Sequence, residues 1–214
     1  ENGFKIAVNI LNIGRIKLGV AAVGGSKAVT SRAVKYAKER KQFGVPIATF
    51  GAIKHKIGEV TSQFFASESA HYRAGQNIDD AYEALIAGGM EPAKARLKSL
   101  EDFAIECAIL KVHGSEVLDM SVDEGVQIYG GMGFSAEGPM DRAYRDARIN
   151  RIFEGTNEIN RLLTIDMLIK RAIKGTLDLM NPMMAVQKEL MAIPEFGASE
   201  DEGIFAKEKK VLVN

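Results

Sequence analysis

Apolar residues recur every three or four positions along most of the chain, the spacing that places them on one face of an α-helix. No stretch as long as a β-strand alternates apolar and polar residues, the pattern that marks a half-buried strand. The three longest periodic stretches predict long helices over Phe4–Phe43, Phe50–Ile86 and Ala93–Tyr129. We therefore predict an all-α protein.

Glycine and proline separate these helices. Gly44–Ile47 contains Pro46, which cannot continue a helix, and the glycine-rich segments Ala87–Pro92 and Gly130–Phe134 are typical helix ends. Long helices joined by short connections pack antiparallel, so the sequence predicts an up-and-down four-helix bundle.

Two shorter helices are expected after the third long one. The first covers Met140–Ala147, and the second covers Asn157–Lys174. The second is apolar on more than one side, so we expect it to be largely buried.

The helical pattern weakens beyond Gly175. Met180–Met184 interrupts it, and a short amphipathic helix then extends to about Met191. The charged tail Pro194–Asn214 is expected to be loosely ordered. We assign residues 1–175 to the helical bundle domain and residues 176–214 to the start of a short, partly disordered C-terminal helical extension.

The composition is that of an ordinary globular protein, with 46% hydrophobic and 26% charged residues among 214. Lysine plus arginine balance aspartate plus glutamate at 28 each, so no excess positive charge is available to neutralise a phosphate backbone. Nucleic acid is therefore not an expected partner. No run of 18 apolar residues occurs, so we expect no transmembrane segment. The chain opens with Glu1-Asn2-Gly3-Phe4, without a signal or transit pattern, and we expect a fragment of a longer protein.

Cysteine and histidine are too few and too scattered to form a metal site. Cys107 is the only cysteine, which excludes an internal disulfide and fits a reducing compartment. His55, His71 and His113 lack a metal-site spacing, and we interpret each as a helix-surface or core residue.

Glu154 is the strongest candidate for chemistry. It follows the apolar pair Ile152-Phe153 and precedes Gly155 and Thr156, and threonine is a good N-cap for the helix predicted next. A carboxylate set just ahead of a helix N-terminus, and partly removed from water, suits a general base. The alternative is an ordinary negative charge that complements the helix dipole.

Three blocks along the chain resemble the flavin-dependent acyl-CoA dehydrogenases. Ile152–Ile159, preceded by Arg145-Asp146, resembles the signature of that family, and Ala37–Gly44 and Gln127–Phe134 agree with it in the same order. The resemblance covers about Gly3–Gly175, which corresponds to the family's C-terminal helical domain.

The resemblance implies an FAD-dependent oxidation of an acyl-CoA thioester to a trans-2-enoyl-CoA, in fatty acid β-oxidation, with Glu154 removing the α-proton. The alternative base of isovaleryl-type relatives falls here at Gly14, which cannot act. The run Asn12–Arg15 is similar to the very-long-chain branch, where this helix lines the acyl-CoA site. The implied substrate contacts are Asn12, Arg15, Phe153 and Gly155. The implied FAD contacts are Arg40, Gln42 and Phe43 toward a neighbouring subunit, with Gln127, Gly130, Gly131, Thr156 and Glu158.

Without the resemblance, these blocks have simpler interpretations. Arg40-Lys41 would be cations at a helix C-terminus, and Gly130–Gly133 would be a helix-ending turn that does not match the dinucleotide glycine spacing. The segment Asp79–Leu100 is longer than the family's usual turn between the second and third helices. The alternative function is a non-catalytic helical bundle for subunit association.

The resemblance also implies partners and a compartment. It implies a homodimer or a dimer of dimers, with electron-transfer flavoprotein as the electron acceptor. The location would be the cytoplasm in a bacterium or the mitochondrial matrix in a eukaryote. The family's N-terminal and middle domains are absent from this chain, so we expect the chain alone to be inactive.

Overall fold

The computed structural model describes residues 3–191 and is almost entirely helical, which confirms the predicted all-α class. The chain divides into two compact units, residues 1–165 and 166–214, and the boundary falls inside the helix α7. The first unit holds the bundle and every residue predicted for the site. The tail Pro194–Asn214 lies outside the described residues.

The elements of the first unit follow in order along the chain. The helices are α1 (Gly3–Glu39), α2 (Gly51–Ala87), α3 (Pro92–Asp102), α4 (Ala104–Tyr129), α5 (Gly131–Phe134) and α6 (Pro139–Arg148). Single 3₁₀ turns cover Ile47–Thr49 and Ile149–Arg151, and two short strands are β1 (Lys41–Gln42) and β2 (Val45–Pro46). The helix α7 (Asn157–Ile173) begins in this unit, and α8 (Met180–Met191) belongs to the second.

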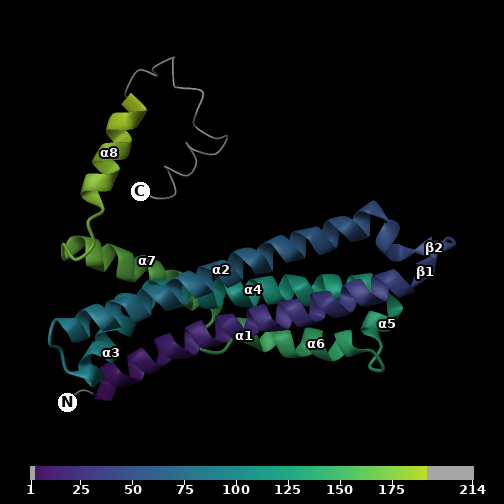
Figure 1. Cartoon of the computed structure of the whole chain (residues 1–214), viewed down its shortest axis with the longest axis horizontal. Helices are drawn as coiled ribbons and strands as arrows, with labels where there is room; N and C mark the ends of the chain where they lie inside the picture. Colours follow the sequence, from purple (N-terminus) through teal and green to yellow (C-terminus); the bar gives the residue numbers. More distant parts are fainter. Residues whose placement is uncertain (1–2, 192–214) are drawn as a thin grey trace. The chain divides into compact units, whose positions relative to one another are not determined.

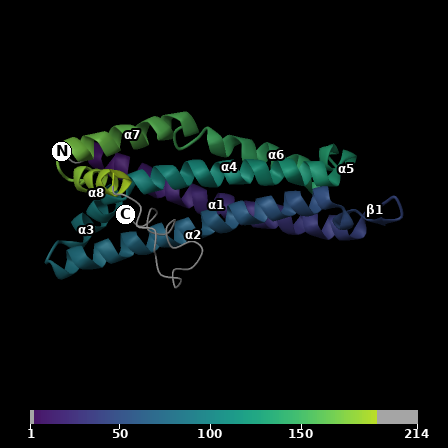
Figure 2. The same ribbon diagram turned by 90° about the horizontal axis from the view of Figure 1, so that it is seen from above.

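Three long helices, α1, α2 and α4, run side by side in alternating directions (Figures 1 and 2). The fourth member of the bundle consists of α6, which packs against α4, and the first turns of α7, whose Asn157 and Arg161 hydrogen-bond to side chains of α4. This arrangement is the predicted up-and-down bundle, with its fourth member in two pieces.

The core is built from small and branched residues because the helices approach closely. Its largest cluster joins α1 to α4, α6 and the 3₁₀ turn after β2, through Ala22, Val29, Ala33, Ala37, Ile47, Leu118, Val122, Ile128, Met140 and Ala147. Where α1 crosses α4, a Cβ on Gly114 would lie 2.9 Å from the backbone oxygen of Gly19. Glycine at position 114 therefore sets how closely these two helices pack.

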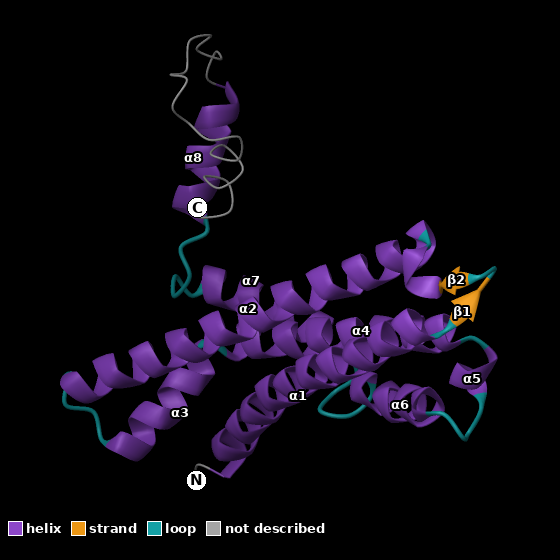
Figure 3. Ribbon diagram, turned by 45° about the vertical axis from the view of Figure 1, so that its right-hand side comes forward, coloured by secondary structure: helices purple, strands orange, loops and turns teal. Residues whose placement is uncertain are grey.

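The first long helix is shorter than predicted. It ends at Glu39, and a tight hairpin of β1 and β2 follows, orange in Figure 3. Phe43 and Gly44, at the turn, have φ angles of 54° and 83°, and positive φ at both central residues is the geometry of a two-residue hairpin turn. The prediction missed the hairpin because each strand is only two residues long.

The third predicted helix is broken in two. The backbone leaves helical geometry at Phe103 (φ −101°, ψ 23°), which separates α3 from α4. The carboxylate of Glu91 caps α3 by accepting hydrogen bonds from the backbone N–H groups of Ala93 and Lys94, both at 3.0 Å. The predicted turn over Ala87–Pro92 is confirmed, and the long segment around it is the end of α2 together with α3.

The prediction that the helix after Thr156 is largely buried is wrong. Only Asn157 and Asn160 are buried in α7. Leu163, Met167 and Leu168 are partly buried, and five further apolar side chains are half or more exposed: Ile159, Leu162, Ile165, Ile169 and Ile173. The cause is that α7 meets the rest of its unit through polar residues, which leaves its apolar faces uncovered. The break predicted over Met180–Met184 is also wrong, because Pro182 lies in the first turn of α8, where proline is tolerated.

The helix α1 is long and apolar enough to cross a membrane by length and composition alone, and the expectation of no transmembrane segment stays a prediction. Core helices of bundles meet the same criterion. In this structure α1 packs against α2 and α4 and buries the polar side chains of Asn9, Asn12 and Arg15 within the protein.

Replacing Gly114 with alanine tests the close contact between α1 and α4. Alanine favours a helix over glycine by about 1 kcal/mol, but its Cβ would overlap the backbone of Gly19, and such overpacking costs about 1–3 kcal/mol. We expect Gly114→Ala to lower the melting temperature. The control is Gly58→Ala on the exposed face of α2, where nothing lies within 4 Å of the added carbon and the change should be neutral or stabilising. Equal melting temperatures for the two variants would contradict the contact.

Candidate active site

The turn Glu154–Thr156, called here the Glu154 turn, joins the 3₁₀ turn after α6 to α7. Both Glu154 (φ 57°) and Gly155 (φ 81°) have left-handed backbone conformations. Glycine adopts this conformation freely, but a residue with a side chain does so at a cost of about 1–2 kcal/mol. The hydroxyl of Thr156 accepts a hydrogen bond from the backbone N–H of Ile159 at 3.3 Å, as expected of an N-cap.

Buried side chains from three helices donate hydrogen bonds to the carbonyl groups of this turn. The Asn160 amide of α7 donates to the carbonyls of Glu154, Gly155 and Thr156 at 3.3, 2.8 and 3.1 Å. The Lys111 ammonium of α4 donates to the Gly155 carbonyl at 2.8 Å, and Arg15 Nε of α1 donates to the Glu154 carbonyl at 3.4 Å. The turn is therefore fixed from several sides.

Lys111 is fully buried and is the centre of a polar network. Its ammonium also donates to Oδ1 of Asn157 at 2.7 Å, and the amide of Asn157 donates in turn to Ser115 Oγ at 3.0 Å. Burial lowers the pKa of Lys111, an effect strengthened by Arg15 and opposed by the neighbouring glutamates, among them Glu154. A buried cation thus lies close to the candidate base.

The carboxyl group of Glu154 points at Gly14 of α1. A Cβ at position 14 would lie 2.7–2.8 Å from the carboxyl atoms, so any larger residue there would displace the carboxyl group from this position. Oε2 of Glu154 is buried and has no hydrogen-bond partner among the described residues. Burial lowers the pKa of Arg15, and the nearby Glu154 carboxylate opposes that shift. An unpartnered carboxylate oxygen beside a cation is available to accept a proton.

Two of the four predicted substrate contacts lie deep in the protein. Asn12 and Arg15 are buried, and Arg15 Nη1 donates to Oδ1 of Asn12 at 3.2 Å. Phe153 is 46% exposed, and Gly155 is half-buried inside the turn. All four lie around Glu154, and their contact with a substrate stays a prediction.

Two of the predicted cofactor blocks meet in one groove of about 440 Å³. Arg40 and Gln42, from the end of α1 and from β1, line it together with Gly130 and Gly131 at the end of α4. The ring of Tyr36 stacks on that of Tyr129 at its edge, with centroids 4.0 Å apart. An exposed guanidinium, an amide and glycines that leave room for a ligand form a suitable lining for the phosphate-bearing part of FAD.

The other predicted cofactor residues are divided between the hairpin end of the bundle and the Glu154 turn. Phe43 is 93% exposed at the hairpin tip, and Gln127 is exposed on the last turn of α4. Thr156 and Glu158 lie at the start of α7, beside the candidate base. Ser115, which belongs to the Lys111 network, and Gly130, which lines the groove, lie roughly 22 Å apart along α4 at the helical rise per residue.

Sequence reasoning missed Lys111, Ser115, Asn157 and Asn160 as functional candidates. A lysine within an otherwise apolar stretch was the one available signal, since a charged residue on a core face must find a partner. The partner is a carbonyl group far along the chain, which periodicity cannot reveal.

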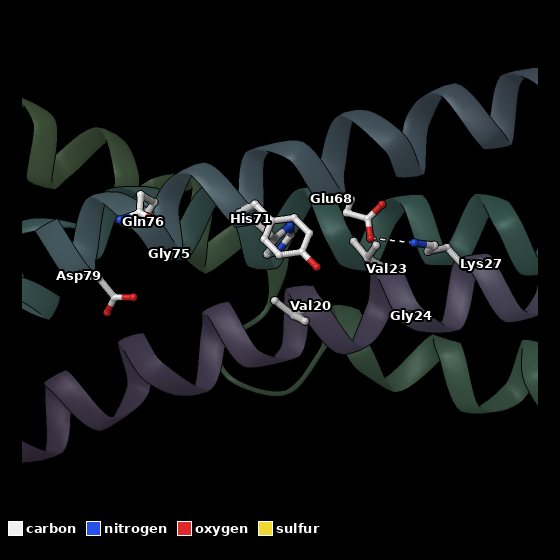
Figure 4. A pocket seen from close by; sticks show the side chains of 10 residues that line it. Val20, Val23, Gly24, Lys27, Glu68, His71, Gly75, Gln76 and Asp79 are labelled. Atoms are coloured by element: carbon white, nitrogen blue, oxygen red, sulfur yellow. Dashed lines mark hydrogen bonds and ion pairs between the residues drawn. The ribbon is translucent and has the colours of Figure 1, made fainter.

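A further groove, of about 460 Å³, lies between α1 and α2 (Figure 4). The Lys27–Glu68 ion pair, at 2.7 Å, lies at one end of it, and Asp79 lies at the other. His71 is buried against Gly19 of α1, and its Nε2 has no hydrogen-bond partner among the described residues. None of the predicted site residues lines this groove. Across the part of the chain that the structure describes, no group of three metal-ligating side chains occurs.

Comparison with known proteins decides the family. The family described as "Acyl-CoA dehydrogenase, C-terminal domain" matches residues 1–169. The chain belongs to the acyl-CoA dehydrogenase family. A probable acyl-CoA dehydrogenase of Bacillus subtilis is 46% identical over 214 residues, which cover 98% of this chain and 36% of that protein.

Solved structures and mitochondrial relatives agree with this assignment. An acyl-CoA dehydrogenase from Bacillus anthracis, complexed with FAD, superposes with a TM-score of 0.89 at 44% identity, over 99% of this chain and 36% of that one. The very long-chain specific acyl-CoA dehydrogenase of Rattus norvegicus is 39% identical over 177 residues, 83% of this chain and 23% of that protein. The chain thus spans about a third or less of the length of these acyl-CoA dehydrogenases.

The environment of Cys107 predicts an inert thiol. Its side chain is fully buried, and burial raises the pKa of the thiol to about 11. Since the thiolate is the reactive form, we expect native protein at neutral pH to resist a thiol reagent, and urea-unfolded protein to react with one equivalent. Rapid labelling of the native protein would contradict this placement of Cys107.

Proposed function

We propose that this chain is the catalytic-base domain of an FAD-dependent acyl-CoA dehydrogenase that oxidises a long-chain acyl-CoA to a trans-2-enoyl-CoA in fatty acid β-oxidation. The observation that carries the proposal is the Glu154 turn, in which a carboxylate with a buried, unpartnered oxygen is held beside Arg15 and Lys111. Membership of the acyl-CoA dehydrogenase family supports the reaction class.

In this proposal Glu154 removes the proton from the carbon next to the thioester carbonyl. That proton is too weakly acidic for water to remove at a useful rate, so a base must be held beside it. The left-handed backbone at Glu154 and the close approach of Gly14 fix where the carboxylate lies. The proton ends on a carboxylate oxygen, and Arg15 and Lys111 bear on the charge that the base carries before the transfer.

FAD, when bound, supplies the acceptor for the hydride that leaves the neighbouring β-carbon. Arg40, Gln42, Gly130 and Gly131 would hold the adenosine and phosphate part of a neighbouring subunit's FAD in the groove at the hairpin end, with Phe43 and Gln127 beside it. Thr156 and Glu158 would lie along the flavin that is bound next to Glu154 of the same chain. Asn12, Arg15, Phe153 and Gly155 would border the acyl-CoA substrate.

Further features of the whole protein follow from the same proposal. The similarity to a very long-chain specific enzyme favours a long acyl chain. The electron acceptor would be electron-transfer flavoprotein, and the enzyme would act in the bacterial cytoplasm, or in the mitochondrial matrix in a eukaryote. The bundle domain would cover residues 1–175 and the C-terminal extension would begin at 176. The isolated chain would be inactive, because the remaining parts of the site lie on other domains.

A second candidate function is subunit association without catalysis. The uncovered apolar faces of α7 favour it. A flavin spectrum of the longer protein that contains this chain discriminates between the two functions, because only the first predicts bound flavin.

Replacing Glu154 with glutamine tests the proposed reaction. Glutamine keeps the size of the side chain and removes the base, and losing a positioned base lowers a rate by about 10²-fold to 10⁴-fold. We expect anaerobic bleaching of the flavin by a long-chain acyl-CoA to slow by at least that factor in the full-length protein. The melting temperature should be unchanged, since the carboxyl group makes no hydrogen bond through Oε2. Bleaching within a few-fold of the parent rate would show that Glu154 is not the base.

Self-association is the second test. The groove with Arg40 and Gln42 lies roughly 22 Å along α4 from the network at the Glu154 turn, so we propose that it contacts the FAD of another subunit in a homodimer or a dimer of dimers. Exposed apolar side chains favour pairing of the isolated chain as well. We expect sedimentation at micromolar concentration to show a dimer or larger species. A strict monomer would count against association through this bundle.

A further inference from the structure

The Glu154 turn is fixed by side chains that donate hydrogen bonds to its backbone and none to the Glu154 carboxylate. Lys111 is fully buried in the middle of α4, where an unpaired charge would be very costly. Its ammonium group has two partners at 2.8 Å or less, the Gly155 carbonyl and the Asn157 side chain. Both partners lie at the Glu154 turn or on the first residue of α7, so the whole interaction of this cation is directed at the turn.

Asn160 holds the same turn from the other side. Its amide nitrogen donates to three successive carbonyls, whereas its own buried oxygen has no hydrogen-bond partner among the described residues. A buried oxygen without a partner opposes folding. Stability alone therefore gives little reason for an asparagine here, and holding the turn accounts for it.

The strained backbone at Glu154 explains why such a clamp is needed. A glutamate with φ 57° relaxes to an ordinary conformation unless its neighbours prevent it, and that relaxation would swing the carboxylate away from Gly14. Each carbonyl of the turn accepts at least one hydrogen bond from a buried side chain. The donors thus hold the turn in the conformation that aims the base.

We propose that Lys111 and Asn160 are positioning residues for Glu154, which keep its carboxylate in place without touching the substrate. This inference rests on the proposed function, because it assumes that Glu154 is the base. It predicts that loss of either donor lowers the rate of proton removal while substrate affinity stays the same.

The experiment uses the full-length, FAD-loaded protein with Lys111→Met and Asn160→Ala. The matched control is Lys56→Met, which removes a partly buried lysine of the bundle that is paired with Glu124 at 2.5 Å and bonded to no residue of the turn. Flavin bleaching by a saturating long-chain acyl-CoA is measured with and without deuterium at the α-carbon. Melting temperature, FAD content and backbone amide exchange over residues 153–158 are measured on the same samples.

A misplacement of about 1 Å lowers a rate by about 10²-fold, so we expect bleaching by the folded Lys111→Met protein to slow by about 10-fold to 100-fold. The isotope effect should increase, the substrate dissociation constant should stay within about twofold, and amide exchange in the turn should accelerate. Asn160→Ala should change each quantity in the same direction, and Lys56→Met should change none of them. Because Asn160→Ala buries no new group, it tests the inference even if Lys111→Met does not fold.

Parental rates and isotope effects in folded Lys111→Met and Asn160→Ala proteins would overturn the inference, whatever the melting temperatures of the two variants. Glu154→Gln in the same assay identifies which idea fails. If Glu154→Gln is inactive while Lys111→Met and Asn160→Ala keep the parental rate, the proposed function stands and the positioning role is wrong. If Glu154→Gln also keeps the parental rate, both are wrong.

Discussion

The candidate site depends on hydrogen bonds from buried side chains to the backbone carbonyls of three consecutive residues. Glu154, Gly155 and Thr156 form a turn in which two residues are left-handed, and such a turn has no ladder of its own to satisfy its carbonyl groups. Lys111, Asn160 and Arg15 satisfy them from α4, α7 and α1. The bundle therefore holds the candidate base through the backbone of the turn, and the carboxylate itself keeps an oxygen without a partner among the described residues.

This arrangement accounts for several features of the bundle that packing alone does not require. Burying the cations Arg15 and Lys111 costs free energy, and that cost is offset only where their N–H donors find hydrogen-bond acceptors. Gly14 leaves room for the carboxylate, and Gly114 lets α1 lie close enough to α4 for Arg15 and Lys111 to reach the same turn. The spacing between α1 and α4 thus determines the geometry of the candidate site.

The groove at the hairpin end is organised differently. Its polar residues are exposed, and they come from the ends of elements rather than from the core. Under the proposed function, this groove binds a cofactor that another subunit carries. The buried turn and the open groove correspond to the two parts of the proposed function, proton removal and cofactor contact.

The sequence by itself determined the helical class, the approximate helices and the N-cap at Thr156, which follow from local spacing and from residue types whose chemistry depends on immediate neighbours. It also made Glu154 the candidate base, through the resemblance of three blocks to one family. It could not predict the hairpin, because two-residue strands have no periodicity, or the break at Phe103, which lies in a continuous helical pattern. It also mistook the apolar sides of α7 for buried ones.

Only the tertiary structure decided that Lys111 and Asn160 hold the turn, that Gly14 faces the carboxylate, and that Arg40 and Gly130 share a groove. Lys111 and Gly155, Gly14 and Glu154, and Arg40 and Gly130 are pairs of residues that lie far apart along the chain. Which helix faces meet depends on how whole helices cross. A periodic pattern specifies which face of a helix is apolar. It does not specify which carbonyl a buried lysine will find, because that acceptor belongs to another element.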